Sequence, residues 1–307
     1  MRRLFQQPSL PTRAYIFLTI TSFLFACNHV IGRGVSETIP PIGLSFWRWF
    51  AATMILLPFV FRRIKQSATI CHNSASIMIQ LSVFMIGATT LILVALNFTT
   101  AINVSLINSV QPTVTMLFAC IFAGEILTAR RSLGIICGIV GVVVMIAKAD
   151  WQVLAELDFT SGDFIAMLAM CGFSLYAINI RKIPLALNTS EKLFWVAFIG
   201  SIFLLPFYIA ESILYKTVPL NVTTITVVMT LALLISIIGN ALWNAGNFIV
   251  GPSKAAAFIN LIPVFGAVLA ISFLGEHVYL YHFIGAGLVF VALRLVVGGN
   301  KQTTKKL

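Results

Sequence analysis

Apolar residues fill most of this chain in long blocks that short polar stretches separate. A block of about 20 apolar residues is long enough to cross about 30 Å of hydrocarbon as an α-helix, and a helix satisfies its own backbone hydrogen bonds there. The pattern predicts ten such helices, near residues 14–33, 41–61, 75–97, 100–122, 132–148, 162–180, 192–210, 224–246, 255–274 and 279–297. The chain is therefore predicted to be an all-α integral membrane protein with ten transmembrane helices.

Two parts of the sequence repeat each other. The Phe-Trp pair at residues 46–47 recurs at 194–195, and Leu-Leu-Pro-Phe at 56–59 recurs at 204–207, both 148 residues later. Nearer the end of each copy the offset is 151, which relates Gly-Glu at 124–125 to Gly-Glu at 275–276. Such an internal repeat indicates that the chain consists of two related halves.

Each half holds five predicted helices, and an odd number of crossings places the second half upside down in the membrane relative to the first. The expected divisions are a cytoplasmic tail (1–13), a first repeat (14–148), an external linker (149–161), a second repeat (162–297) and a basic cytoplasmic tail (298–307). In many secondary transporters, inverted repeats meet at a substrate site near the middle of the membrane. This architecture therefore predicts a transporter.

A resemblance to a known family rests on the second span and on the ends of the repeats. The residues that carry it are Pro40, Pro41, Phe46, Trp47, Arg48 and Trp49, with the Gly-Glu pairs at 124–125 and 275–276, each followed by a glycine-rich helix. By these residues, the chain over 14–297 resembles the drug/metabolite transporter superfamily, in particular its ten-helix bacterial branch of paired EamA domains. The resemblance implies an exporter of amino acids, other metabolites or drugs, whose cavity is formed by the first, third, fourth, sixth, eighth and ninth helices.

The charged residues are few and unevenly distributed. Of all residues 59% are apolar and 9% charged, and the net charge is +11. If both termini are cytoplasmic, sixteen of the twenty Lys and Arg residues lie on the cytoplasmic side, with Arg33, Lys148 and Lys216 outside and Arg48 within a span. This asymmetry is typical of membrane proteins, so the charge predicts contact with the lipid bilayer and no nucleic-acid partner. We expect a multi-pass inner (plasma) membrane protein with both termini cytoplasmic, monomeric or weakly homodimeric.

The eighth span carries a polar stripe. Ser236, Asn240, Asn244 and Asn247 follow one another at intervals of four, four and three residues, with Trp243 beside them, so they share one face of a helix. Polar side chains that face lipid are costly, and this face is therefore expected to meet a water-filled cavity or a neighbouring helix. The alternative to a cavity wall is hydrogen bonding between helices, which contributes about 0.6 to 2 kcal/mol per contact.

Other spans bring amides, hydroxyls and two proline kinks to the same region. We expect kinks at Pro112 and Pro263 to open backbone groups near Asn108 and Asn260, although kinks that only shape packing are equally common. The predicted substrate site comprises Asn28, His29, Arg48, Thr90, Asn97, Asn108, Pro112, Tyr176, Asn179, Trp243, Asn244, Asn247 and Asn260. For His29, a packing role is the alternative to proton transfer.

Arg48 lies about seven residues inside the second span, where a buried guanidinium is costly without a partner. No Asp or Glu lies well inside any predicted span. Backbone carbonyls, water, Glu37 in the short external loop and the carboxylate of a substrate are therefore the possible partners. A structural role at the external end of the helix and a substrate-binding role both remain open.

The remaining chemistry argues against an enzyme. The four histidines are dispersed, no HExxH pattern occurs, and the acids lie in loops or at helix ends, so we expect no catalytic residues, metal site or cofactor. Amides, hydroxyls and aromatic rings bind neutral or zwitterionic solutes. The sequence thus predicts a secondary transporter, an exporter of amino acids or related small metabolites by alternating access, with drug efflux or a non-transporting scaffold or lipid-handling role as alternatives.

Overall fold

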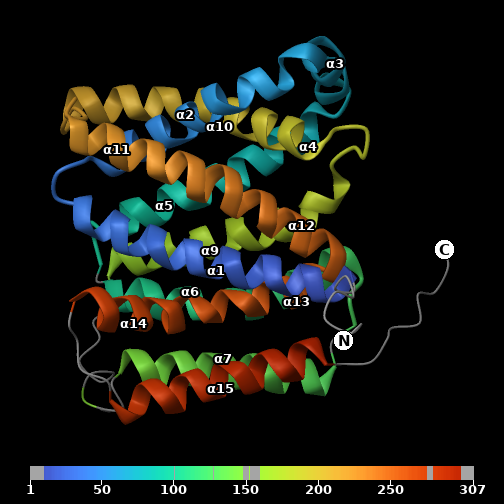
Figure 1. The fold of residues 1–307 in the computed structure, drawn as a ribbon, viewed down its shortest axis with the longest axis vertical. Coiled ribbons are helices and arrows are strands. Elements are labelled where there is room, and N and C mark those ends of the chain that lie inside the picture. The colour runs from blue at the N-terminus through green and yellow to red at the C-terminus, as the bar shows by residue number, and fades with distance from the viewer. Residues whose placement is uncertain are drawn as a thin grey trace, which may run out of the picture.

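The computed structural model describes residues 10–99, 101–126, 128–147, 152, 160–274 and 279–298. Within these ranges the regular structure is entirely helical. The helices lie side by side and cross the molecule back and forth between two opposite edges (Figure 1). The predicted all-α architecture is confirmed.

The first half contains five helical spans, two of which are assembled from shorter segments. In chain order the segments are α1 (Leu10–Val35), α2 (Pro41–Val60), the 3-10 turn η1 (Phe61–Arg63), α3 (Ile64–Asn73), α4 (Ala75–Ser82), the π-helix η2 (Val83–Gly87), α5 (Ala88–Ala95), α6 (Ala101–Ala123) and α7 (Ala129–Ile146). The third span is thus α4, η2 and α5 in continuous succession.

The second half also contains five spans, with its short turns at different places. Its segments are α9 (Ser161–Asn179), the 3-10 turn η3 (Ile180–Lys182), α10 (Thr189–Leu214), α11 (Val222–Thr230), the π-helix η4 (Leu231–Gly239), α12 (Asn240–Val250), α13 (Pro252–Ala257), the 3-10 turn η5 (Phe258–Asn260), α14 (Leu261–Leu274) and α15 (Leu280–Val297). In both halves the third span is interrupted by a π-helix, a feature that is frequent at functional sites.

The helices have the length and composition that a membrane requires. Six described helical stretches are long and apolar enough to cross it, and two shorter apolar stretches are Ile107–Ala123 and Phe283–Val297. Large apolar side chains such as Phe59, Ile121 and Phe290 are exposed on the outer surface. A surface of this kind matches hydrocarbon rather than water.

The packing of the helices shows the relationship between the halves. α2 packs on α10 and α7 packs on α15, so each of these helices contacts its own counterpart. α1, the first span of one half, contacts α12 and α14 in the third and fourth spans of the other half. α9, the first span of the second half, contacts α5 and α6 in the third and fourth spans of the first half. Exchange of the two halves therefore reproduces the same set of contacts, as expected of a pseudo-two-fold arrangement.

The two halves run in opposite directions. α1 begins beside the end of α12. The backbones are close there, as a β-carbon added to Gly246 of α12 would lie 3.3 Å from the carbonyl oxygen of Ala14 in α1. α9 ends at the same edge, since the side chain of Asn247 donates to the carbonyl oxygen of Ala177 at 2.8 Å. The first helix of one half thus starts where the first helix of the other half finishes, and the inverted repeat is confirmed.

The repeated Phe-Trp motif has the same geometry in both halves. In α2 the rings of Phe46 and Phe50 stack with centroids 5.9 Å apart, and Trp47 meets Phe50 edge-on at 5.8 Å. In α10 the residues 148 positions later, Phe194, Trp195 and Phe198, form a stack at 5.9 Å and an edge contact at 5.8 Å. Sequence repetition and local structure therefore agree.

The α2 and α10 pair is fixed at both ends. Glu211 of α10 accepts hydrogen bonds from the backbone N–H groups of Ile42 and Gly43 at 3.0 and 2.6 Å, at the start of α2. At the other end Arg63 lies 3.5 Å from Glu191, in the first turn of α10. Both carboxylates meet the positive end of a helix, where negative charge is stabilising.

The fifth and tenth spans approach each other through small residues. A β-carbon at Gly141 of α7 would lie 2.7 Å from the carbonyl oxygen of Gly285 in α15. Close contact of the two backbones therefore requires glycine here. In the turn before α7, Glu125 forms an ion pair with Arg131 at 3.4 Å, whereas its expected counterpart Glu276 lies outside the described residues.

The two expected proline kinks have different outcomes. α6 continues as one helix through Pro112. In the ninth span, by contrast, the α-helix gives way to the 3-10 turn η5 shortly before Pro263. Proline cannot donate the backbone hydrogen bond of an α-helix, so the irregular turn agrees with the position of Pro263.

Candidate substrate cavity

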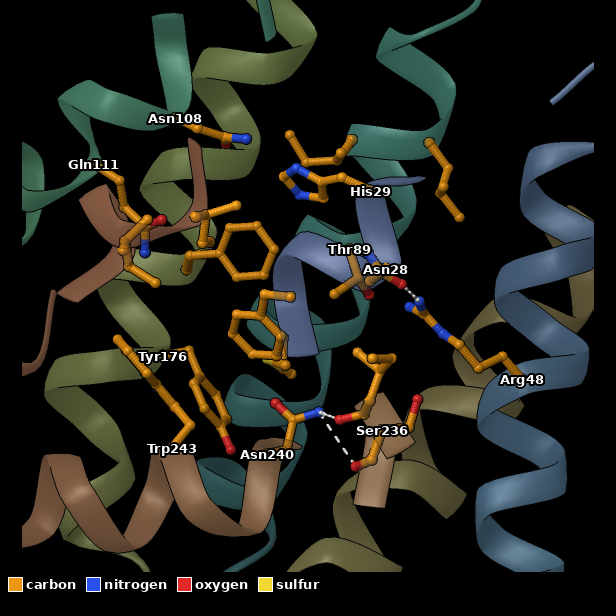
Figure 2. A pocket seen from close by; sticks show the side chains of 18 of the residues that line it. Asn28, His29, Arg48, Thr89, Asn108, Gln111, Tyr176, Ser236, Asn240 and Trp243 are labelled. Atoms are coloured by element: carbon orange, nitrogen blue, oxygen red, sulfur yellow. Dashed lines mark hydrogen bonds between the residues drawn. The ribbon is translucent and has the colours of Figure 1, made fainter. Parts of the chain in front are cut away.

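A cavity of about 90 Å³ lies where the two halves meet. It is lined from both repeats, by α1, α2, the third span and α6 of the first and by α9, the eighth span and the ninth span of the second. Its polar and amphipathic lining includes Asn28, His29, Arg48, Thr89, Asn108, Gln111, Tyr176, Ser236, Asn240 and Trp243 (Figure 2). The second span thus joins the six helices that the family resemblance implied.

Arg48 brings a positive charge to the cavity wall. Its side chain is only 2% exposed, and Nη1 donates to Oδ1 of Asn28 in α1 at 3.2 Å. The guanidinium carbon lies 5.4 Å from the ring centroid of Trp49, a distance suited to a cation–π interaction. Nε has no hydrogen-bond partner. The acceptor that the structure gives Arg48 is therefore an amide, and the exposed Glu37 does not fill this role.

The polar stripe of the eighth span divides into two parts. Ser236 and Asn240 line the cavity, and their oxygens Oγ and Oδ1 are buried without hydrogen-bond partners. The amide nitrogen of Asn240 donates to the carbonyl oxygens of Ile235 and Ser236 at 3.1 and 3.2 Å, within the π-helix. This part of the stripe offers free acceptors to a solute.

The other part of the stripe joins the eighth span to α9, next to Tyr176 on the cavity wall. The hydroxyl of Tyr176 donates to Oδ1 of Asn244 at 3.0 Å, and the amide of Asn247 donates to the carbonyl oxygen of Ala177 at 2.8 Å. One turn further on, Arg181 donates to the carbonyl oxygen of Phe248 at 3.0 Å. Both interpretations of the stripe therefore apply, each to a different half of it.

Some predicted site residues lie away from the cavity wall. Thr90 shares a hydrogen bond with Ser45 at 2.7 Å, and Asn179 donates to a carbonyl of its own helix at 2.8 Å. Asn97 is exposed beyond the end of α5 and donates to the carbonyl oxygen of Leu93 at 3.0 Å. Pro112 is buried within α6. Of the thirteen predicted residues, those on the wall of this cavity are Asn28, His29, Arg48, Asn108, Tyr176 and Trp243.

Asn260 lines a neighbouring cavity of about 220 Å³ between α1, α6 and the ninth span. His29 and Asn108 line both cavities. Asn260 is 3% exposed, its side-chain oxygen lacks a partner, and Pro263 contributes to the same wall. The 3-10 turn before Pro263 therefore brings the unpaired side-chain oxygen of Asn260 to the cavity that adjoins the one between the halves.

Thr89, Gln111, Ser236 and Asn240 line the cavity but were not among the predicted site residues. Thr89 follows the π-helix η2 in the third span. Thr89 lies on the same face as the wall residues Met85 and Ile92, whereas the adjacent Thr90 bonds Ser45. For Ser236 and Asn240 the signal was the polar stripe of the eighth span, but the residues that were selected from this span were Trp243, Asn244 and Asn247.

Comparison with known proteins decides the family. The model of the EamA-like transporter family matches twice, at residues 12–147 and 160–298. The chain belongs to the EamA-like transporter family. This EamA-like protein is thus a membrane-embedded transporter of small molecules and not an enzyme.

Relatives of this EamA-like transporter match from about two thirds of its length to nearly all of it. It is 24% identical over 290 residues to the uncharacterized transporter YyaM of Bacillus subtilis, covering 92% of this chain and 93% of that one. It is 27% identical over 203 residues to a probable amino-acid metabolite efflux pump of Escherichia coli, covering 64% and 67%. A solved crystal structure matches its fold with a TM-score of 0.72 at 15% identity, covering 91% and 94%.

Proposed function

We propose that this EamA-like transporter exports amino acids or related small metabolites by alternating access through the central cavity. The observation that carries the proposal is the polar lining of a membrane-buried cavity by both inverted halves. A site between two inverted halves is exposed to either face of the membrane when one half moves against the other. The name of the Escherichia coli relative, a probable amino-acid metabolite efflux pump, supports the substrate class.

We propose that the contact between α9 and α12 closes one edge of the cavity and has to open in this cycle. Its hydrogen bonds are few, and bonds of this kind contribute only about 0.6 to 2 kcal/mol each in a membrane. The free energy of a bound solute is therefore sufficient to alter the balance between open and closed states.

We propose that both termini are cytoplasmic in the inner membrane, because most Lys and Arg residues then lie inside. A reporter that is active only in the periplasm is expected to function when fused at Glu156 and to be silent at Lys65. The opposite result would invert the orientation.

Drug efflux is the second candidate, favoured by the large apolar share of the wall. Phe25, Phe173, Ile259 and Ile262 line the cavity together with Trp243. Apolar and aromatic side chains of this kind accommodate drug-sized solutes by shape and contact.

Flux into inside-out proteoliposomes tests the function. A panel of labelled amino acids, their derivatives and amphiphilic drugs is supplied to wild type, to Asn240→Ala at the cavity wall and to Gln80→Ala as a control. Gln80 is exposed on α4, where its side chain bonds Ser76, and it does not line the cavity. We expect saturable flux of an amino-acid-like solute that Asn240→Ala reduces by about tenfold and Gln80→Ala leaves unchanged. Flux confined to drugs would favour the second candidate, and no flux at all would reject transport through this cavity.

A further inference from the structure

The charge of Arg48 has no counter-charge in the described part of the molecule. The five described acidic residues all lie at helix ends or in loops. Glu37 is exposed, Glu125 pairs with Arg131, Asp163 bonds Thr99 and Thr160, Glu191 caps α10 and lies beside Arg63, and Glu211 caps α2. None of them lines the cavity. The wall that the structure describes is therefore positively charged.

The other lining groups do not change this sign. Asn108, Gln111, Ser236 and Asn240 are neutral, and the remaining wall is mostly apolar or aromatic. His29 is either neutral or positive and adds no negative charge. A buried cation surrounded by neutral groups is costly unless an anion joins it.

The guanidinium is also incompletely bonded. Asn28 takes one hydrogen bond from Nη1, and Nε has none although Arg48 is nearly fully buried. A carboxylate supplies both the missing acceptor and the missing charge, and guanidinium–carboxylate pairs are among the stronger hydrogen-bonded contacts. The described residues around Arg48 thus leave an acceptor and a negative charge to be supplied by a solute.

An ammonium group on the same solute would meet a different environment. Only amide oxygens, hydroxyls and aromatic faces are present to receive it. A zwitterion adds no net charge, so the charge of Arg48 would remain uncompensated, whereas a monoanion neutralises it. In a medium of low dielectric constant this difference favours the monoanion.

We propose that the site selects monocarboxylates without an ammonium group, that is, 2-oxo acids with an apolar side chain, over the amino acids of the same carbon skeleton. The carboxylate binds Arg48, and the side chain lies against the apolar wall that includes Phe25 and Trp243. The inference rests on the proposed function and narrows its substrate class from amino acids and related metabolites to anionic derivatives of apolar amino acids.

Matched pairs of solutes test the selection in wild-type protein. Counterflow in proteoliposomes compares 4-methyl-2-oxopentanoate with leucine, and phenylpyruvate with phenylalanine. We expect the half-saturation concentration of each oxo acid to be lower than that of its amino acid by about tenfold. Equal or better transport of the amino acids would overturn the selection and leave the proposed function standing. Flux of no panel solute would contradict both.

Variants of Arg48 test the anchor separately. Arg48→Gln is expected to remove the preference for the oxo acid, and Arg48→Lys, which keeps the charge, to retain part of it. Arg62→Gln is the matched control, since Arg62 is exposed in the turn that follows α2. Arg48→Gln protein that keeps both its thermal stability and the full preference would overturn the role of Arg48. If Arg48→Gln does not fold, Arg48→Lys and the wild-type comparison decide the matter.

Discussion

The side-chain oxygen of Asn28 in α1 accepts a hydrogen bond from Nη1 of Arg48 in α2 at 3.2 Å. Asn28 thereby orients the guanidinium at the wall of the cavity without neutralising it (Figure 2). An amide at this position leaves the positive charge of Arg48 available to an anionic solute, whereas a carboxylate would neutralise it.

Replacement of Asn28 by Asp is therefore expected to occupy Arg48 internally. An Asp side chain supplies the counter-charge at hydrogen-bond distance, so anionic solutes should bind more weakly by about tenfold or more. The half-saturation concentration for 4-methyl-2-oxopentanoate in counterflow measures the effect. Gln80→Glu, which adds the same charge at an exposed site on α4, should have no effect. Unchanged affinity in Asn28→Asp would show that Arg48 is not the anion anchor.

Loss of the hydrogen bonds between α9 and the eighth span should favour opening of the closed edge. In Tyr176→Phe combined with Asn247→Ala, two contacts disappear, and the ratio of open to closed protein should rise roughly tenfold. Spin labels at the exposed positions Lys182 and Ile249 report the distance between the two helix ends. The double variant should populate a longer distance that Ser201→Ala does not, because Ser201 bonds only within α10. Identical distance distributions would argue against these bonds as the closure.

Glu211 is expected to stabilise the contact between the halves. Glu211→Ala removes two hydrogen bonds from a charged acceptor to the start of α2, which corresponds to a loss of roughly 1 to 3 kcal/mol. Thermal unfolding in detergent, followed by tryptophan fluorescence, should show a Tm several degrees lower than that of wild type. Glu37→Ala, at an exposed loop position, serves as the control. Equal Tm values for Glu211→Ala and wild type would contradict the stabilising role.

The fold follows from the sequence because its signals are redundant. Apolar blocks of membrane length predict the spans, and the Phe-Trp repeat independently predicts two halves whose aromatic contacts then coincide. An odd number of spans per half fixes the inversion. Each of these signals can be read from one stretch of sequence or from a count of spans, so none depends on how side chains pack between helices.

The site was less predictable because it depends on helix rotation. In the third span Thr90 was predicted, whereas the structure places the adjacent Thr89 on the wall and Thr90 against Ser45 of α2. In the eighth span the spacing cannot show that Ser236 and Asn240 face the cavity while Asn247 bonds α9. Which part of a polar stripe meets a neighbouring helix is decided by packing between the halves, and a single helix does not contain this information.

The central claim is that the cavity between the inverted halves opens to each side of the membrane in turn. The direct measurement is the reaction of Ser236→Cys, in a background without the native cysteines, with a membrane-impermeant thiol reagent added to either face of oriented vesicles. Ser236 is buried on the cavity wall, and Met54→Cys, on the outer apolar surface, is the control. The account predicts reaction of Ser236→Cys from both faces, slowed by leucine or 4-methyl-2-oxopentanoate, and none of Met54→Cys. Reaction from one face only, or from neither, would contradict it.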